Sequence, residues 1–230
     1  MFRLQDVRKC YRKRHHEVVA FHVDQLDIER GEYVAVIGAS GSGKTTLLTL
    51  LGGMLSPDCG TVLFDGESLY DLPVVERTKR RREHIGFVFQ TFNLVPYLTA
   101  LENVALALYL GGLDRSFHRV RAAKLLEQVG LGDRLDHKPS ELSTGQQQRV
   151  ALARTLANDP QVILADEPTG NLDPESRKMV LAMFDRFVGQ GRTIVMVTHD
   201  PAAAQCAQRR LSLRDGEIVE PVPDSSTSAA

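Results

Sequence analysis

Hydrophobic and polar residues follow two different periods along this chain. In its first third, apolar residues alternate with polar ones or form short continuous runs, a pattern typical of β-strands. The predicted strands are 2–7, 17–22, 25–28, 33–37, 61–64 and 85–89. From about 91 to 157 apolar residues recur every three or four positions instead, as in Ala122, Leu125 and Val129, which predicts helices.

Strands and helices alternate again in the last third. Continuous apolar runs predict buried strands at 162–165 and 193–197, and Asp215-Gly216 predicts a tight turn between strands 211–213 and 217–219. Asp173-Pro174 opens a predicted helix, whose inner face comprises Val180, Leu181, Phe184, Phe187 and Val188. Parallel strands joined by helices, with a helical insert, predict an α/β fold. The tail 221–230 has little to bury and is predicted to be disordered.

Composition narrows the setting without identifying a function. The 230 residues are 43% hydrophobic and 25% charged with a net charge of −1, ordinary values for a soluble globular protein. This charge gives no general reason to expect nucleic acid as a partner. Cys10, Cys59 and Cys206 lack metal-ligand spacing, so we expect free thiols in a reducing, cytosolic setting.

A glycine-rich loop carries the clearest chemistry. Residues 38–45, Gly-Ala-Ser-Gly-Ser-Gly-Lys-Thr, match G-x-x-x-x-G-K-[ST] between the strand 33–37 and a predicted helix 44–55 that Ser56-Pro57 ends. Glycines let the backbone approach phosphates closely, and the helix N-terminus favours anions. Lys44 would reach the β- and γ-phosphates, and Thr45 would bind Mg²⁺. An ordinary glycine-rich turn is the alternative, but all four fixed positions and both flanking elements are present.

Two acidic residues follow the strand 162–165. A P-loop needs a carboxylate for Mg²⁺ at the end of a neighbouring buried strand, and Asp166 is placed to provide it. Glu167 follows, and we expect it to act as the general base that polarises the attacking water. Four apolar residues and an acid are common by themselves, so this interpretation depends on the P-loop upstream.

A third motif makes the chain resemble the ATP-binding-cassette (ABC) ATPases. Residues 142–149, Leu-Ser-Thr-Gly-Gln-Gln-Gln-Arg, resemble the signature motif of that family. Gln90 resembles its Q-loop glutamine, Asp173 belongs to a D-loop-like Gly-Asn-Leu-Asp, and His199 resembles the switch histidine. Thr144 departs from the pattern, because glycine is usual there. The resemblance spans the chain from Phe2 to about residue 219.

The resemblance implies a fold and its subdivision. It implies a P-loop NTPase (RecA-like) core with an N-terminal antiparallel β subdomain, formed together by 1–90 and 158–220. It also implies an inserted α-helical subdomain at 91–157, so that 1–220 form one ABC ATPase domain.

The resemblance also implies a site for ATP and Mg²⁺. Catalytic roles fall to Glu167, His199, Gln90 and Lys44, and Mg²⁺ ligation to Thr45, Gln90 and Asp166. The residues implied to contact ATP are Tyr11, Gly38, Ser40, Gly41, Ser42, Gly43, Lys44, Thr45, Thr46, Ser143, Gly145, Gln146 and Asp173. Three of the catalytic and ATP-contacting residues also have a structural interpretation: Tyr11 as a half-exposed strand-end tyrosine, His199 as a histidine with a structural partner, and Ser143 as a helix N-cap.

In this family two subunits pair head-to-tail, so that the signature of one covers the γ-phosphate bound by the other. The implied partner is therefore a second copy of the chain. Residues 90–104 resemble the groove that receives a coupling helix from a separate membrane permease, although an ordinary buried loop and helix start would look similar. The implied location is peripheral, on the cytoplasmic face of the inner (plasma) membrane.

Residues 82–94 and 166–173 are similar to the macrolide-exporter, lipoprotein-releasing and cell-division (MacB/LolD/FtsE-like) group. This likeness implies an energy-coupling subunit for export or for extraction of a substrate from the membrane or periplasm. An alternative is an FtsE-like mechanotransducer that regulates cell-envelope enzymes without transport. A soluble ABC ATPase acting on nucleic acid has only the basic runs 79–82 and 8–16 in its favour, and such runs are more often solvated faces. We therefore expect no nucleic-acid partner.

Overall fold

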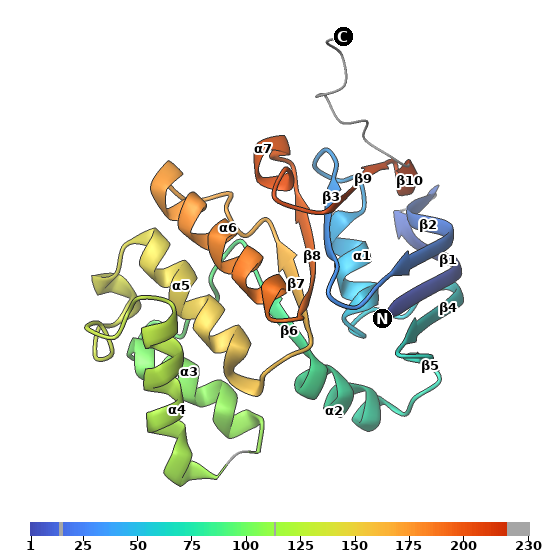
Figure 1. Ribbon diagram of the computed structural model, residues 1–230. Coiled ribbons are helices and arrows are strands. Elements are labelled where there is room, and N and C mark those ends of the chain that lie inside the picture. The colour runs from blue at the N-terminus through green and yellow to red at the C-terminus, as the bar shows by residue number, and fades with distance from the viewer. Residues whose placement is uncertain (14–15, 113, 220–230) are drawn as a thin grey trace.

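A single twisted sheet runs through the molecule (Figure 1). The structure, a computed structural model, describes residues 1–13, 16–112 and 114–219. The strand order of the sheet is β5-β4-β1-β2-β10-β9-β3-β8-β7-β6. One half is parallel, as the continuous apolar runs predicted. It contains β3 (Tyr33–Ile37), β6 (Ile85–Val88), β7 (Val162–Asp166), β8 (Thr193–Thr198) and β9 (Arg209–Arg214). The mixed α/β fold is therefore confirmed.

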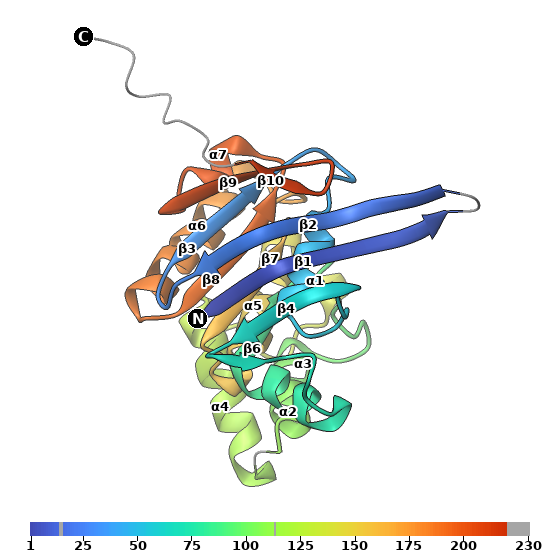
Figure 2. The same ribbon diagram turned by 90° about the vertical axis from the view of Figure 1, so that its right-hand side faces the viewer.

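The other half of the sheet is mainly antiparallel. A long hairpin reaches beyond the neighbouring strands (Figure 2) and pairs Tyr11 with Val18. β10 pairs antiparallel with β9 and closes onto the hairpin through the single parallel pair Glu217–His22. These strands are β1 (Phe2–Lys13), β2 (His16–Ile28), β4 (Cys59–Phe64), β5 (Glu67–Ser68) and β10 (Glu217–Val219).

Helices cover both faces of the sheet, and the sheet separates two hydrophobic clusters. One cluster packs α1 against the hairpin and the inner strands, and the other packs α3, α4, α5 and α6 against β3, β7 and β8. The helices are α1 (Lys44–Leu51), α2 (Val74–His84), α3 (Ala100–Leu110), α4 (Arg115–Gln128), α5 (Thr144–Thr155), α6 (Pro174–Gly189) and α7 (Pro201–Ala204). Two short 3₁₀ turns, Pro139–Glu141 and Leu156–Asn158, flank α5. No helix among the described residues is long and apolar enough to cross a membrane.

Several predicted boundaries are wrong for local reasons. The helix predicted at 44–55 ends at Leu51, because Gly53 adopts a left-handed φ of 65° well before Ser56-Pro57. The two strands predicted at 17–22 and 25–28 form one continuous strand, β2, and the strand predicted at 2–7 extends to Lys13. The predicted disorder of 221–230 lies outside the described residues.

Candidate functional site

One large cavity, of about 830 Å³, opens where the carboxyl ends of the parallel strands meet the hairpin. Segments far apart in the sequence converge on it: the hairpin, the glycine-rich loop, the ends of β6, β7 and β8, and the β9–β10 turn. Its lining includes eleven of the predicted site residues, namely Tyr11, Ser40, Gly41, Gly43, Lys44, Thr45, Thr46, Gln90, Asp166, Glu167 and His199. The crevice at the carboxyl ends of strands is the usual ligand position in open α/β sheets.

The glycine-rich loop joins β3 to α1 with the geometry that a phosphate loop requires. Gly43 caps α1 at a φ of 106°, and a Cβ there would lie 2.1 Å from the carbonyl oxygen of Ala20. The position therefore excludes every residue other than glycine. Lys44 is almost fully buried and donates from Nζ to the carbonyl oxygens of Gly38 (2.6 Å) and Ala39 (2.9 Å). This ammonium thus lies folded back along its own loop.

The β9–β10 turn braces this loop from outside. Gly216 donates its backbone N–H to the carbonyl of Ser42 (3.0 Å) and accepts from the N–H of His22 (2.7 Å). Gly38 is close-packed, because a Cβ there would approach the carbonyl oxygen of Leu213 to 2.4 Å. Gly38 and Ser42 therefore hold the loop in place, and neither of them lines the cavity.

Thr45 and Asp166 form the polar pair expected of a magnesium site. The Thr45 hydroxyl donates to Asp166 Oδ2 at 3.0 Å, and both side chains reach the cavity. Burial raises the pKa of Asp166, and the hydrogen bond from Thr45 opposes this shift. A hydroxyl and one carboxylate fit Mg²⁺, which in phosphate sites takes few protein ligands beside substrate oxygens and water.

Glu167 occupies the most constrained position in the site. It is a non-glycine residue with a left-handed φ of 46°, a conformation that is rare and concentrated at functional sites. Its carboxylate accepts from the Thr198 hydroxyl (3.1 Å), lies 2.9 Å from Nδ1 of His199 and 3.9 Å from Nζ of Lys44. Thr198 and His199 at the end of β8, together with Lys44 at the start of α1, thus hold this carboxylate beside the phosphate loop.

Gln90 and Tyr11 line the cavity from two separate elements. Gln90 follows β6, and its backbone carbonyl accepts a hydrogen bond from Asn171 at 3.3 Å, so the loop after Glu167 contacts the loop that begins at Gln90. Tyr11 lies on the hairpin opposite Val18, and both side chains are about half exposed. An exposed aromatic ring with an apolar neighbour offers a stacking surface for a nucleobase.

The remaining predicted residues lie away from the cavity. Ser143 caps α5 in a capping box with Gln146, with hydrogen bonds of 3.2 and 2.9 Å. Asp173 caps α6 and accepts from the backbone N–H groups of Glu175 and Ser176. A hydrogen bond from the Ser176 side chain, together with these backbone bonds, holds the pKa of the Asp173 carboxyl below the usual range. Gly145 is buried against Ser176, whereas Thr144 is exposed. The extra methyl of Thr144 therefore finds room, and the chain does not bring Ser143, Gly145, Gln146 or Asp173 to its own phosphate loop.

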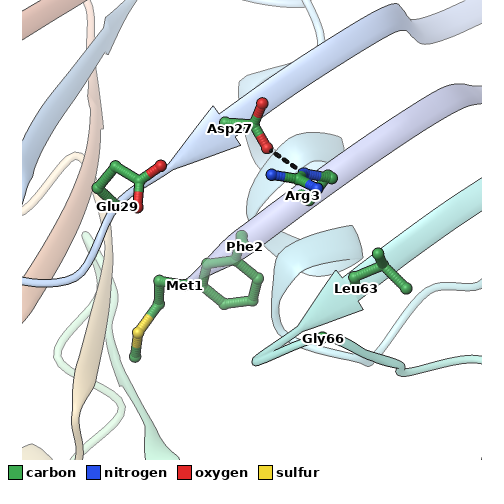
Figure 3. A pocket seen from close by; sticks show the side chains of 7 residues that line it. All are labelled: Met1, Phe2, Arg3, Asp27, Glu29, Leu63 and Gly66. Atoms are coloured by element: carbon green, nitrogen blue, oxygen red, sulfur yellow. Dashed lines mark hydrogen bonds and ion pairs between the residues drawn. The ribbon is translucent and has the colours of Figure 1, made fainter.

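Sequence reasoning missed several residues of the site. Val18, Val19 and Ala20 form one wall, and Asp215 reaches the cavity from the β9–β10 turn. The Asp-Gly turn was visible in the sequence, but only the sheet order shows that it meets the phosphate loop. By contrast, a smaller cleft of about 190 Å³ at the N-terminus (Figure 3) contains an Arg3–Asp27 ion pair and none of the predicted site residues.

The parallel sheet and the phosphate loop at its edge define a P-loop nucleotide hydrolase. A family model described as "ABC transporter" matches residues 21–170. "Uncharacterized ABC transporter ATP-binding protein MJ1508" of Methanocaldococcus jannaschii is 48% identical, covering 96% of this chain and 98% of the relative. The chain belongs to the ABC transporter family, as its ATP-binding ATPase domain.

A transporter with a fused permease and a solved cassette structure are also similar to this chain. "Macrolide export ATP-binding/permease protein MacB" of Syntrophobacter fumaroxidans is 47% identical over 224 residues, and the chain spans 31% of its length. The solved "Dimeric structure of a post-hydrolysis state of the ATP-binding cassette MJ0796 bound to ADP and Pi" superposes with a TM-score of 0.88 at 42% identity, covering 96% of this chain and 97% of that one. That relative is therefore a dimeric cassette with nucleotide bound.

Proposed function

We propose that the chain is the ATP-hydrolysing, energy-coupling subunit of an ABC transporter that closes head-to-tail on Mg-ATP and drives a separate membrane permease. One observation carries the proposal. The cavity holds Lys44 and Glu167, whereas Ser143 and Gly145 lie outside it on the same chain. One copy thus assembles the half of a composite site that contains Lys44 and Glu167. The other half, at the start of α5, lies on another part of its surface.

Within one copy, each residue has a separate task. Lys44 leaves its loop carbonyls and binds the β- and γ-phosphates, while Tyr11 stacks on the adenine. Glu167 accepts the proton of the attacking water, and His199 orients that carboxylate through the 2.9 Å contact. Thr45, Asp166 and Gln90 would hold Mg²⁺, which when bound supplies charge neutralisation at the phosphate oxygens.

Between two copies, the capped N-terminus of α5 faces the partner's nucleotide. Ser143 is the N-cap of the 12-residue helix α5, and Gly145 lies in its first turn. A helix N-terminus favours a bound phosphate. Gln146 and the D-loop residue Asp173 complete this face. Because the γ-phosphate then belongs to both copies, ATP favours the closed dimer and hydrolysis releases it.

The permease docks on the loop between Gln90 and α3. Tyr97 exposes 73% of its surface there and offers an aromatic side chain to a partner. Behind it, the buried amide of Asn103 bonds Val95, Leu98 and Thr99, which gives the loop a firm base. The likeness to MacB supports export or extraction as the direction of transport, from the cytoplasmic face of the inner membrane.

Replacing Glu167 by glutamine tests the central claim. We expect Glu167→Gln to bind ATP as wild type does, to lose about 10²–10⁴-fold in hydrolysis, and to accumulate an ATP-dependent dimer in size-exclusion chromatography. Glu127→Gln, on the exposed face of α4, is the matched control and should behave as wild type. Hydrolysis by Glu167→Gln at a rate near that of wild type would contradict the proposal.

A further inference from the structure

Gln148 is a fully buried polar residue on α5 that the site described above does not use. Its relative exposure is 0%, and its side-chain neighbours at i+3 and i+4, Ala151 and Leu152, are buried and apolar. Its amide donates from Nε2 to the carbonyl oxygen of Pro168 at 2.7 Å. Pro168 follows Glu167 directly, so a single side chain joins the helix of Ser143 and Gly145 to the loop of the general base.

Only the nitrogen of the Gln148 amide makes a hydrogen bond among the described residues. Oε1 of Gln148 is buried and has no hydrogen-bond partner among the described residues. A buried acceptor without a donor is unfavourable, and an apolar side chain of the same length would avoid that cost. Packing alone therefore does not explain a glutamine here, whereas the bond to Pro168 does.

Helix α5 is also fixed at its other end. The Thr155 hydroxyl donates to the carbonyl oxygen of Phe87 in β6 (2.7 Å), and Arg154 donates to the carbonyl oxygen of Phe92 (2.7 Å). In its first turn Gln147 donates to the carbonyl oxygens of Pro139 (2.9 Å) and Leu142 (3.0 Å), and Gly145 lies against Ser176 of α6, but neither contact reaches the loop after Glu167. The hydrogen bond from Gln148 to Pro168 therefore ties the first half of α5 to the loop after Glu167.

We propose that Gln148 is a positioning residue: through Pro168 it sets the place of the Ser143–Gly145 turn that each copy offers to its partner. The loop after Glu167 belongs to the chain's own ATP site, and the start of α5 belongs to the partner's. The bond therefore links the two composite sites of one dimer. This inference rests on the head-to-tail dimer of the proposed function.

The test separates closure of the dimer from binding of ATP by one copy. Gln148→Met keeps the length and removes the bond, and Gln128→Met, on the exposed end of α4, is the matched control. Each is made in the Glu167→Gln background. Three quantities are measured: the affinity of the dilute chain for a fluorescent ATP analogue, the thermal midpoint, and the ATP-dependent dimer dissociation constant by analytical ultracentrifugation.

We expect Gln148→Met to leave the affinity for the analogue within about twofold while the dimer dissociation constant rises about tenfold or more. With Glu167 intact, kcat should fall by a similar factor. A merely structural role would lower nucleotide affinity and thermal midpoint together. If the dimer dissociation constant of Gln148→Met equals that of Gln128→Met, this inference is overturned and the proposed function is not. Failure of the Glu167→Gln parent to dimerise overturns the proposed function, and this inference with it.

Discussion

A methyl group added at Gly145 probes the contact between the first turn of α5 and α6. The Cβ of Gly145→Ala would lie 2.1 Å from Oγ and 2.6 Å from Cβ of Ser176. Oγ can rotate away, but Cβ cannot; ordinary contact begins at 3.4 Å, so the two helices must separate by about 0.8 Å at this point (3.4 − 2.6). Forced separations of this kind cost about 1–3 kcal/mol, equivalent to roughly 2–12 °C in thermal midpoint for a chain of this size.

The assay is thermal unfolding of the chain without nucleotide, so that no phosphate contact contributes. Ser176→Gly removes both clashing atoms and should restore most of the loss in the double variant, measured against Ser176→Gly alone. Ser176→Ala is the matched control, because it removes Oγ but leaves Cβ at 2.6 Å. Full thermal stability of Gly145→Ala, or equal rescue by Ser176→Ala, would refute the reasoning.

Two other expectations follow from buried polar groups. Asn103→Ala removes four hydrogen bonds that hold 95–99, and we expect a loss of about 2–4 kcal/mol in the free energy of unfolding by urea titration. Burial raises the pKa of Asp166 above its usual value of 3.8, so the folded state binds this proton more readily than the unfolded state does. The free energy of unfolding therefore falls as the pH rises through the raised pKa. Without Mg²⁺, Asp166→Asn should therefore lose less stability than wild type between about pH 4 and pH 7, and an identical pH profile would contradict this.

Regular elements were predictable where the side-chain pattern decides the outcome. The strand 33–37 has the predicted bounds because five consecutive buried or half-buried residues permit little else. Helix α2 went unpredicted, because none of its residues is buried and it therefore shows no apolar stripe. The end of α1 was missed because Gly53, and not the later proline, turns the backbone.

The site was predictable to the extent that its residues form contiguous motifs. Lys44, Thr45, Asp166 and Glu167 were found from local spacing, and the sheet brings them together. Thr198 and Asp215 were not, because their contribution depends on strand order, which has no local signal. Ser143 and Gly145 were predicted to contact ATP, and this stays a prediction, because within one copy they lie away from the phosphate loop.

The bracing of the phosphate loop by Gly216 has a consequence for biosynthesis. The loop lies far upstream of its partners in the sequence, because β3 pairs with β8 and β9, and the carbonyl oxygen of Ser42 accepts its hydrogen bond from Gly216 in the β9–β10 turn. A nascent chain on the ribosome thus carries an unfinished nucleotide site until almost its last described strand has emerged. Because such distant pairings close late, ATP is a ligand for the finished molecule and offers little help to a folding intermediate.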